Sequence, residues 1–142
     1  MSVTLSLHEL GAYFIRYEVK HEPYERAVGD PETWRERGCP TEPVVGPREA
    51  HYRVEQLLQA DGVMFLCPKC FYANDGPAGT HWVICWFAGK VPPDAQPGPG
   101  RWFPAGSGLA DLSFVGTGST SVHLRSGCGW HGHVRNGEAT LT

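Results

Sequence analysis

Two short stretches decide how this chain folds: Cys67-Pro68-Lys69-Cys70 and Cys128-Gly129-Trp130-His131. The first is a C-x₂-C turn and the second is a C-x₂-H turn. Such a turn directs both side chains at one ion and exposes backbone amides that stabilise negative sulfur. Three thiolates and one imidazole form the closed tetrahedral set of structural zinc, and soft sulfur ligands favour zinc over calcium or magnesium. The sequence therefore predicts a structural Zn²⁺ site with these ligands: Cys67, Cys70, Cys128 and His131.

The fourth ligand has alternatives. His133 lies two residues beyond His131 on the same side of an extended chain, so it could replace His131 or hydrogen-bond beside it. His81 is a more distant alternative, because it also fits the start of a strand. Cys85 lies inside an apolar run and is expected in the core. Cys39, in a Gly-Cys-Pro turn, is expected to be a free surface thiol.

The two cysteine turns are far apart in the sequence, which is unlike the compact zinc motifs. A metal held in this way closes a sheet across the domain and does not make a free-standing finger. The alternative without a metal is that Cys67 and Cys70 are buried as small hydrophobic residues, with Cys128 a turn residue.

Composition limits the class of protein. The chain has 142 residues, 41% of them hydrophobic, which fits one globular domain. With Gly 18 and Pro 12, short strands and turns are favoured over long helices. The net charge of −3 argues against sequence-independent binding of nucleic acid, which needs many lysine and arginine residues. The N-terminus lacks a signal-peptide pattern and the longest apolar run, residues 83–88, is too short for a membrane span. We therefore expect a cytosolic chain whose odd cysteine count favours metal binding over disulfides.

Periodicity predicts the first elements. Residues 13–20 alternate with period two and indicate a strand, whereas residues 22–49, rich in proline and glycine, are interpreted as a long irregular excursion. A short helix is expected at 53–60. Buried strands are expected at 63–66 and at 81–87, the second of them central because both of its faces are apolar.

The remaining chain is expected to form loops and short strands. Residues 89–108 read as a second long loop, pinned to the core by Trp102-Phe103. Asn136-Gly137 supplies the two positive-φ positions of a type I′ turn and predicts a hairpin at the C-terminal end. The other strands are expected at 112–115, 121–125, 131–135 and 138–141.

Together these elements predict a mainly β fold. It would be a small antiparallel sheet or sandwich with one short helix, crosslinked by the structural zinc. We expect a single domain over residues 1–142. Within it, residues 1–59 give an N-terminal strand plus the irregular excursion, and residues 60–142 give the zinc-bound β core.

Five separated motifs resemble a family of small proteins encoded by tailed bacteriophages and prophages. The resemblance covers about residues 60–142, and its motifs lie at 62–71, 79–87, 97–102, 108–114 and 127–132. It implies a phage gene product with the zinc-binding turns. Family members are often labelled ammonia monooxygenase, but a thiolate-rich closed site suits zinc and not oxygen-activating copper. The resemblance implies no established activity.

The first functional hypothesis is a non-enzymatic module. Four protein ligands leave zinc no position for water, so the metal would serve folding. The protein would be a virion-associated structural protein or an accessory protein that binds a host protein, in the host bacterial cytoplasm or carried in the virion. Its partner would be a protein, with no nucleic acid and no membrane expected.

Two other hypotheses stay open. A zinc-dependent hydrolase would need a water-bound metal and a carboxylate base, with the histidines at 81, 131 and 133 and with Asp111 or Glu138 in those roles. Neither H-E-x-x-H nor the deaminase pattern occurs. A nucleic-acid-binding zinc ribbon would rely on aromatic stacking, since only Lys69 lies inside the cysteine turns.

Overall fold

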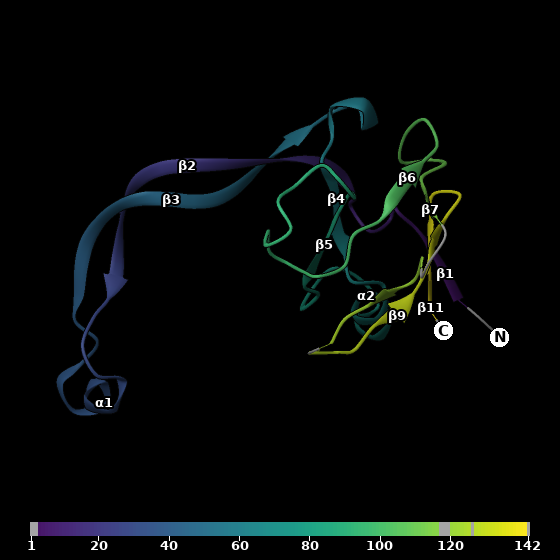
Figure 1. Ribbon diagram of the computed structural model, residues 1–142. Coiled ribbons are helices and arrows are strands. Elements are labelled where there is room, and N and C mark those ends of the chain that lie inside the picture. The colour runs from purple at the N-terminus through teal and green to yellow at the C-terminus, as the bar shows by residue number, and fades with distance from the viewer. Residues whose placement is uncertain (1–2, 117–119, 126, 142) are drawn as a thin grey trace. The chain divides into compact units, whose positions relative to one another are not determined.

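The computed structural model describes residues 3–116, 120–125 and 127–141 (Figure 1). It is mainly β with antiparallel sheets and one short helix longer than a turn, which confirms the predicted fold class. The chain divides into two compact units. Unit 1 comprises Met1–Tyr17 with Tyr52–Thr142, and unit 2 comprises Glu18–His51. The unit boundaries lie at residues 17/18 and 51/52, whereas the two predicted parts of the single domain meet at residues 59/60.

Unit 1 contains most of the strands. They are β1 (Val3–Ser6), β4 (Gly62–Leu66), β5 (Trp82–Trp86), β6 (Phe103–Ala105), β7 (Ser113–Val115), β8 (Val122–His123), β9 (His131–Gly132), β10 (Val134–Arg135) and β11 (Glu138–Leu141). The helical segments of this unit are the 3₁₀ turn η2 (Leu57–Gln59) and helix α2 (Pro68–Asn74). Strand β2 (Tyr13–Ala27) begins in unit 1 and ends in unit 2, and β3 (Thr41–Val54) begins in unit 2 and ends in unit 1. Between them in unit 2 lie η1 (Pro31–Thr33) and α1 (Trp34–Arg37).

The largest sheet has the strand order β3-β2-β4-β5. Strand β4 lies inside this sheet, and Val63 and Phe65 are fully buried, as an apolar run predicts. Strand β5 was predicted to be central, but it is one of the two edge strands, with β3 at the other edge. The second apolar face of β5 is not covered by another strand. On that face Trp82 is 44% exposed, and Trp86 is covered by the 96–102 loop.

Three smaller sheets complete unit 1. Strands β1, β11 and β10 form one sheet, and β6-β7 and β8-β9 form two antiparallel pairs. Asn136 and Gly137 both have positive φ, 50° and 75°, between β10 and β11, which confirms the predicted hairpin turn.

The core of unit 1 joins these sheets. Buried residues from the segment before β2 pack with residues of β4, β5, β7, β8, β10 and β11. Trp130 is 1% exposed, and its ring stands edge-on to Phe65 with centroids 5.9 Å apart. Trp102 stacks on Phe114 at 5.5 Å, so the predicted pin between the 89–108 loop and the core is present, although the neighbouring Phe103 is exposed.

Unit 2 corrects the prediction of an irregular excursion at 22–49. Strands β2 and β3 continue through most of it as hydrogen-bonded neighbours, and the Arg26 guanidinium pairs with the Glu42 carboxylate between them. Only Tyr13–Ile15 of β2 pair with β4, so beyond that point each strand has one free edge. Proline lacks an N–H but is tolerated on a free edge, where alternate amides face solvent. Pro43 and Pro47 are both exposed and lie an even number of residues apart, so their amide positions lie on the same side of β3.

The position of the short helix is also corrected. Residues 53 and 54 end β3, and the rest of the 53–60 segment contains only the 3₁₀ turn η2, because three apolar residues do not supply a helix-long buried face. The seven-residue helix is α2, which begins directly after Cys67 with Pro68 in its first turn. Among the described residues, no helix is long and apolar enough to span a membrane.

Candidate metal centre

The C-x₂-C turn is built where β4 meets α2. Cys67 lies at the N-cap of α2, and its carbonyl oxygen accepts the first helical bond from the Phe71 N–H at 2.9 Å. Cys70 is the third residue of the helix, and residues three apart lie on the same face, so Cys70 and Cys67 are neighbours. The Cys70 N–H donates to the Cys67 sulfur. This arrangement agrees with the prediction that the turn directs two sulfurs and a backbone amide at one point.

His81 joins this turn through strand pairing. Leu66 on β4 pairs with Trp82 on β5, so Cys67 and His81 are the next residues opposite each other. The Cys67 N–H donates to the His81 carbonyl oxygen at 2.8 Å, which extends the ladder by one bond. The register of the β4-β5 pair therefore places the His81 imidazole beside the Cys67 thiol.

Cys128 reaches the site from a turn that follows β8. Its neighbours Gly127 and Gly129 have φ of 68° and 69°, a conformation that other residues adopt only under strain. Trp130 anchors the turn in the core, where its Nε1–H donates to the Thr140 carbonyl at 3.0 Å. The Lys69 ammonium donates to the Cys128 carbonyl at 2.7 Å and ties this turn to α2.

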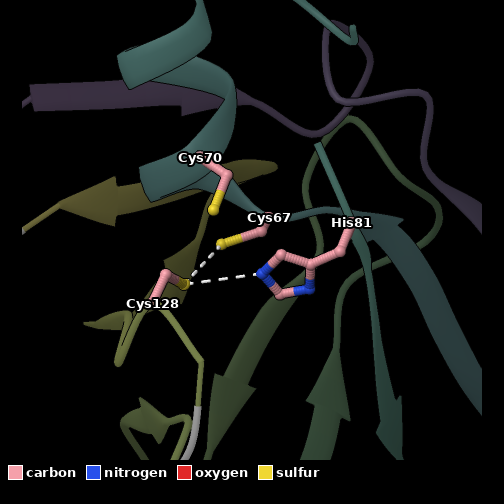
Figure 2. A group of neighbouring side chains, drawn as sticks. All are labelled: Cys67, Cys70, His81 and Cys128. Atoms are coloured by element: carbon pink, nitrogen blue, oxygen red, sulfur yellow. Dashed lines mark hydrogen bonds between the residues drawn. The ribbon is translucent and has the colours of Figure 1, made fainter. Parts of the chain in front are cut away.

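Figure 2 shows the four side chains converging from these three segments. Their ligand atoms all lie within 4.8 Å of one another, and the group could hold a metal ion. The Cys128 sulfur is 3.5 Å from the Cys67 sulfur and 3.4 Å from His81 Nε2. A tetrahedral ion with metal–sulfur bonds of about 2.3 Å and a metal–nitrogen bond of about 2.0–2.1 Å needs S···S of about 3.8 Å and S···N of about 3.6 Å. Both separations lie within about 0.3 Å of those edges.

The His81 ring is oriented as a ligand. Its Nε2 faces the sulfurs, while Nδ1 faces outward, 3.4 Å from the Trp82 carbonyl oxygen. A histidine that donates Nδ1–H to a carbonyl keeps Nε2 unprotonated and available to a metal.

The thiols differ in how readily they ionise. Burial, with the Cys128 thiol and its charge, raises the pKa of Cys67 to about 12, although the bond from the Cys70 amide opposes this. Burial also raises the pKa of Cys70. Burial acts the same way on Cys128, but its hydrogen bonds with His81, with the Trp130 N–H and with the other two thiols outweigh it and lower its pKa to about 7. A bound cation would hold all three sulfurs deprotonated, so metal binding would release protons.

The histidine in this cluster is thus His81, whereas the sequence placed His131 there with His133 as its alternative. His131 lies on β9, where its ring is tilted against that of His123 on the paired strand β8, with centroids 4.8 Å apart. His133 is further along, 6.5 Å from His131, and its pKa is lowered by burial and by the charges of Arg135 and His131. The strand direction after the tight Cys128 turn carries both rings away from the sulfurs.

A signal for His81 was present in the sequence. Two apolar strands, 63–66 and 81–87, lie on either side of a short segment and are natural antiparallel partners. Aligning them so that Leu66 faces Trp82 would have brought His81 beside Cys67. The spacing of motifs along the chain does not predict that His81 lies beside Cys67, because the two residues are neighbours across a pair of strands.

The other predicted residues lie outside the cluster. Cys85 is fully buried in the core, and Cys39 is an exposed free thiol; both predictions are confirmed. The Asp111 carboxylate accepts the backbone N–H groups of Ser107 and Gly108, both at 2.9 Å, in its own loop. The Glu138 carboxylate accepts the Thr4 hydroxyl at 3.3 Å between β11 and β1.

Comparison of the chain with protein-family models, with curated proteins and with solved structures found no match. The class of site therefore rests on its own geometry. The fold and the cluster define a mainly β protein in which three cysteines and one histidine from distant segments could hold a metal.

Proposed function

We propose that this chain is a non-enzymatic β module stabilised by one structural zinc ion. The observation that carries the proposal is the convergence of Cys67, Cys70, His81 and Cys128 within 4.8 Å. Three thiolates and one imidazole are the donor set of structural zinc, and they exclude the hard cations that prefer oxygen. With all four positions filled by the protein, zinc has no site for a reactive water.

The placement of the cluster supports a folding role for the metal. It joins the end of β4, the start of β5 and the turn after β8, which are separate segments of unit 1. Structural zinc can supply about 10–16 kcal/mol of apparent binding free energy, and that energy becomes folding energy when the site exists only in the folded chain. One ion of this kind would offset much of the entropy of joining three distant segments.

The biological setting is proposed from the resemblance to proteins of tailed bacteriophages. The protein would act as a virion-associated structural protein or as an accessory protein that binds a host protein. It would reside in the host bacterial cytoplasm or in the particle. A closed metal site and a fold rich in strand edges are consistent with binding a protein partner. Mass spectrometry of purified virions would distinguish the structural role from the accessory role.

The zinc proposal is tested by metal analysis and X-ray absorption of the purified protein. We expect one zinc per chain, with three sulfur neighbours and one nitrogen neighbour. Removal of the metal by a strong chelator should unfold unit 1, as measured by near-ultraviolet circular dichroism. A chain that contains no zinc, and melts at the same temperature with and without chelator, would contradict the proposal.

One observation favours a zinc-dependent hydrolase as the second candidate: Cys70, His81 and Cys128 line a cavity. A reactive metal would open toward that cavity and keep a water ligand. Against this candidate, the carboxylates of Asp111 and Glu138 are engaged in other parts of unit 1. An oxygen neighbour in the X-ray absorption spectrum would support the hydrolase, whereas its absence supports the structural module.

A further inference from the structure

A cavity of about 820 Å³ lies beside the metal cluster, within unit 1. Its size falls in the range of ligand-binding clefts, about 300–1,000 Å³. Cys70, His81 and Cys128 border it, and the 97–102 loop forms another part of its wall. Two further sides come from residues 82–84 of β5 and 121–125 around β8. The two residues that flank these sides, His81 before β5 and Cys128 after β8, are both members of the cluster. A bound metal would therefore fix the spacing of the two sides.

The sides of the cavity are strand edges. Consecutive residues of each strand line it, although side chains of one strand face alternately. This is the expected pattern where the backbone edge itself faces the cavity.

The alternation of hydrogen-bonded and non-hydrogen-bonded pairs along β5 also indicates that its backbone edge faces the cavity. Cys67 and His81 form a hydrogen-bonded pair of the β4-β5 ladder, so Met64 and Ile84 form a non-hydrogen-bonded pair. The N–H and C=O of Ile84 therefore point away from β4. The 96–102 loop pairs with β5 only beyond this point, at Trp86 and Phe87. Within the described residues, the edge at Ile84 is open to another strand.

The pairing of β8 with β9 likewise leaves backbone groups of β8 unpaired with β9, at its other edge. The Leu124 N–H donates to the Trp130 carbonyl at 2.8 Å, so His123 and His131 are a non-hydrogen-bonded pair. The backbone groups of His123 thus point away from β9. Two open edges, at Ile84 and at His123, border one cavity.

The charge of the cavity is opposite to that of the chain. Its lining includes Arg101, Arg125, His81 and His123 and no acidic residue, although the whole chain has Asp+Glu 15 against Lys+Arg 12. Arg101 is committed to the loop, where its guanidinium donates to the carbonyls of Ala95, Pro97 and Gly100. Arg125 is exposed and makes no ion pair among the described residues. Its charge is available to a ligand.

We propose that this groove binds an extended acidic peptide segment of a protein partner, which adds a strand to the open edge of β5. The backbone of the segment pairs with Ile84, and its carboxylates meet Arg125 and His123. Recognition by strand addition takes affinity from backbone hydrogen bonds and specificity from alternate side chains. The proposal rests on the proposed function, because the zinc joins the two sides of the groove.

The test is a selection from a library of random displayed decapeptides against the zinc-loaded full-length chain. We expect the selected peptides to be enriched in Asp and Glu at alternating positions. In fluorescence anisotropy, Arg125→Glu should weaken the best labelled peptide at least about tenfold, because it replaces attraction by repulsion. The control Arg16→Glu changes another exposed arginine, which lies on β2 and does not border the cavity, and it should leave affinity within about twofold.

A second measurement reports the backbone contact. Amide NMR signals of Ile84 and His123 should shift on addition of the peptide, and a central proline in the peptide should abolish the shift because it removes a donor. Selection without acidic enrichment, or equal affinities for wild type and Arg125→Glu, would overturn the proposal. Displacement of the peptide by an oligothymidylate would assign the groove to nucleic acid and would also overturn it. Metal analysis of the same sample separates these outcomes from a failure of the zinc proposal.

Discussion

At the scale of single residues, the metal centre depends on which histidine is the fourth member. His81 Nε2 is 3.4 Å from the Cys128 sulfur, whereas His131 faces His123. We expect His81→Gln to weaken zinc binding, measured by competition with a chromophoric chelator, and His131→Gln to leave it unchanged. Loss of a residue that merely supports a ligand costs about 10–100-fold in metal affinity, so loss of the ligand itself should cost at least as much.

The paired variants make this prediction decisive. Both substitutions remove one imidazole from an exposed position of unit 1, so a general effect of losing a histidine would appear in both. The opposite result, with zinc lost in His131→Gln and retained in His81→Gln, would restore the ligand set that the C-x₂-H spacing suggested.

Asp111 gives a prediction about pH. Its carboxylate accepts hydrogen bonds from the backbone N–H groups of Ser107 and Gly108 and from the Ser107 hydroxyl, and these bonds lower its pKa below the ordinary value of an aspartate. A carboxyl group whose pKa is lower in the folded state than in the unfolded state adds stability to the fold. This stability is fully present above the unfolded-state pKa and is lost as the pH falls through the folded-state pKa. Asp111→Asn should therefore reduce the melting temperature by the same amount at every pH between 8 and about 5. A difference that already shrinks between pH 6 and about 5 would contradict this assignment.

At the scale of elements, the turn after Cys128 is held by close contact between β9 and β11. A Cβ added to Gly132 would collide with the Thr140 carbonyl oxygen and lie 2.8 Å from Trp130 Nε1. Backbone cannot move aside as a flexible side chain can, so Gly132→Ala should destabilise unit 1 by at least the about 1–3 kcal/mol typical of overpacking. Chemical denaturation monitored by tryptophan fluorescence measures this.

Gly108→Ala is the matched control for Gly132→Ala. Gly108 does not have positive φ, and its added Cβ would meet nothing within 4 Å. The control should change stability by no more than about 0.5 kcal/mol. Equal losses in the two variants would mean that the contact with Thr140 does not hold the turn.

The elements also show what sequence can and cannot predict. Strand β4 and the Asn136-Gly137 turn follow from local pattern, since a buried apolar run and a required φ leave little choice. The three cysteines of the cluster follow from their chemistry. The place of His81 does not follow from motif spacing, because the register of the β4-β5 pair determines that it lies beside Cys67. The strands through residues 22–49 were missed because proline counts against a strand in general, but not at alternate positions of a free edge.

At the scale of the whole molecule, the two units differ in how they are stabilised. The buried core and the metal cluster consist of residues outside 18–51. Unit 2 has no buried residue in the part of the chain described, and its strands rely on hydrogen bonds and on partly covered contacts such as that of Tyr24 beside Gly46. A two-stranded ribbon of this kind is marginally stable by itself.

This difference predicts that unit 2 can be removed. Replacing Glu18–His51 with a short Gly-Asn-Gly-Ser linker should leave unit 1 folded, because every core residue and every cluster residue is retained and closing a short loop costs little. We expect the shortened chain to bind one zinc and to keep a cooperative thermal transition, measured by metal analysis and circular dichroism. Full-length Cys67→Ser is the control that should lose both, since it removes a ligand and leaves all of unit 2 in place. A shortened chain that is insoluble, or that no longer holds zinc, would show that residues 18–51 contribute to the folding of unit 1. In that case unit 2 would contribute to the stability of the metal module and would not be a separable unit.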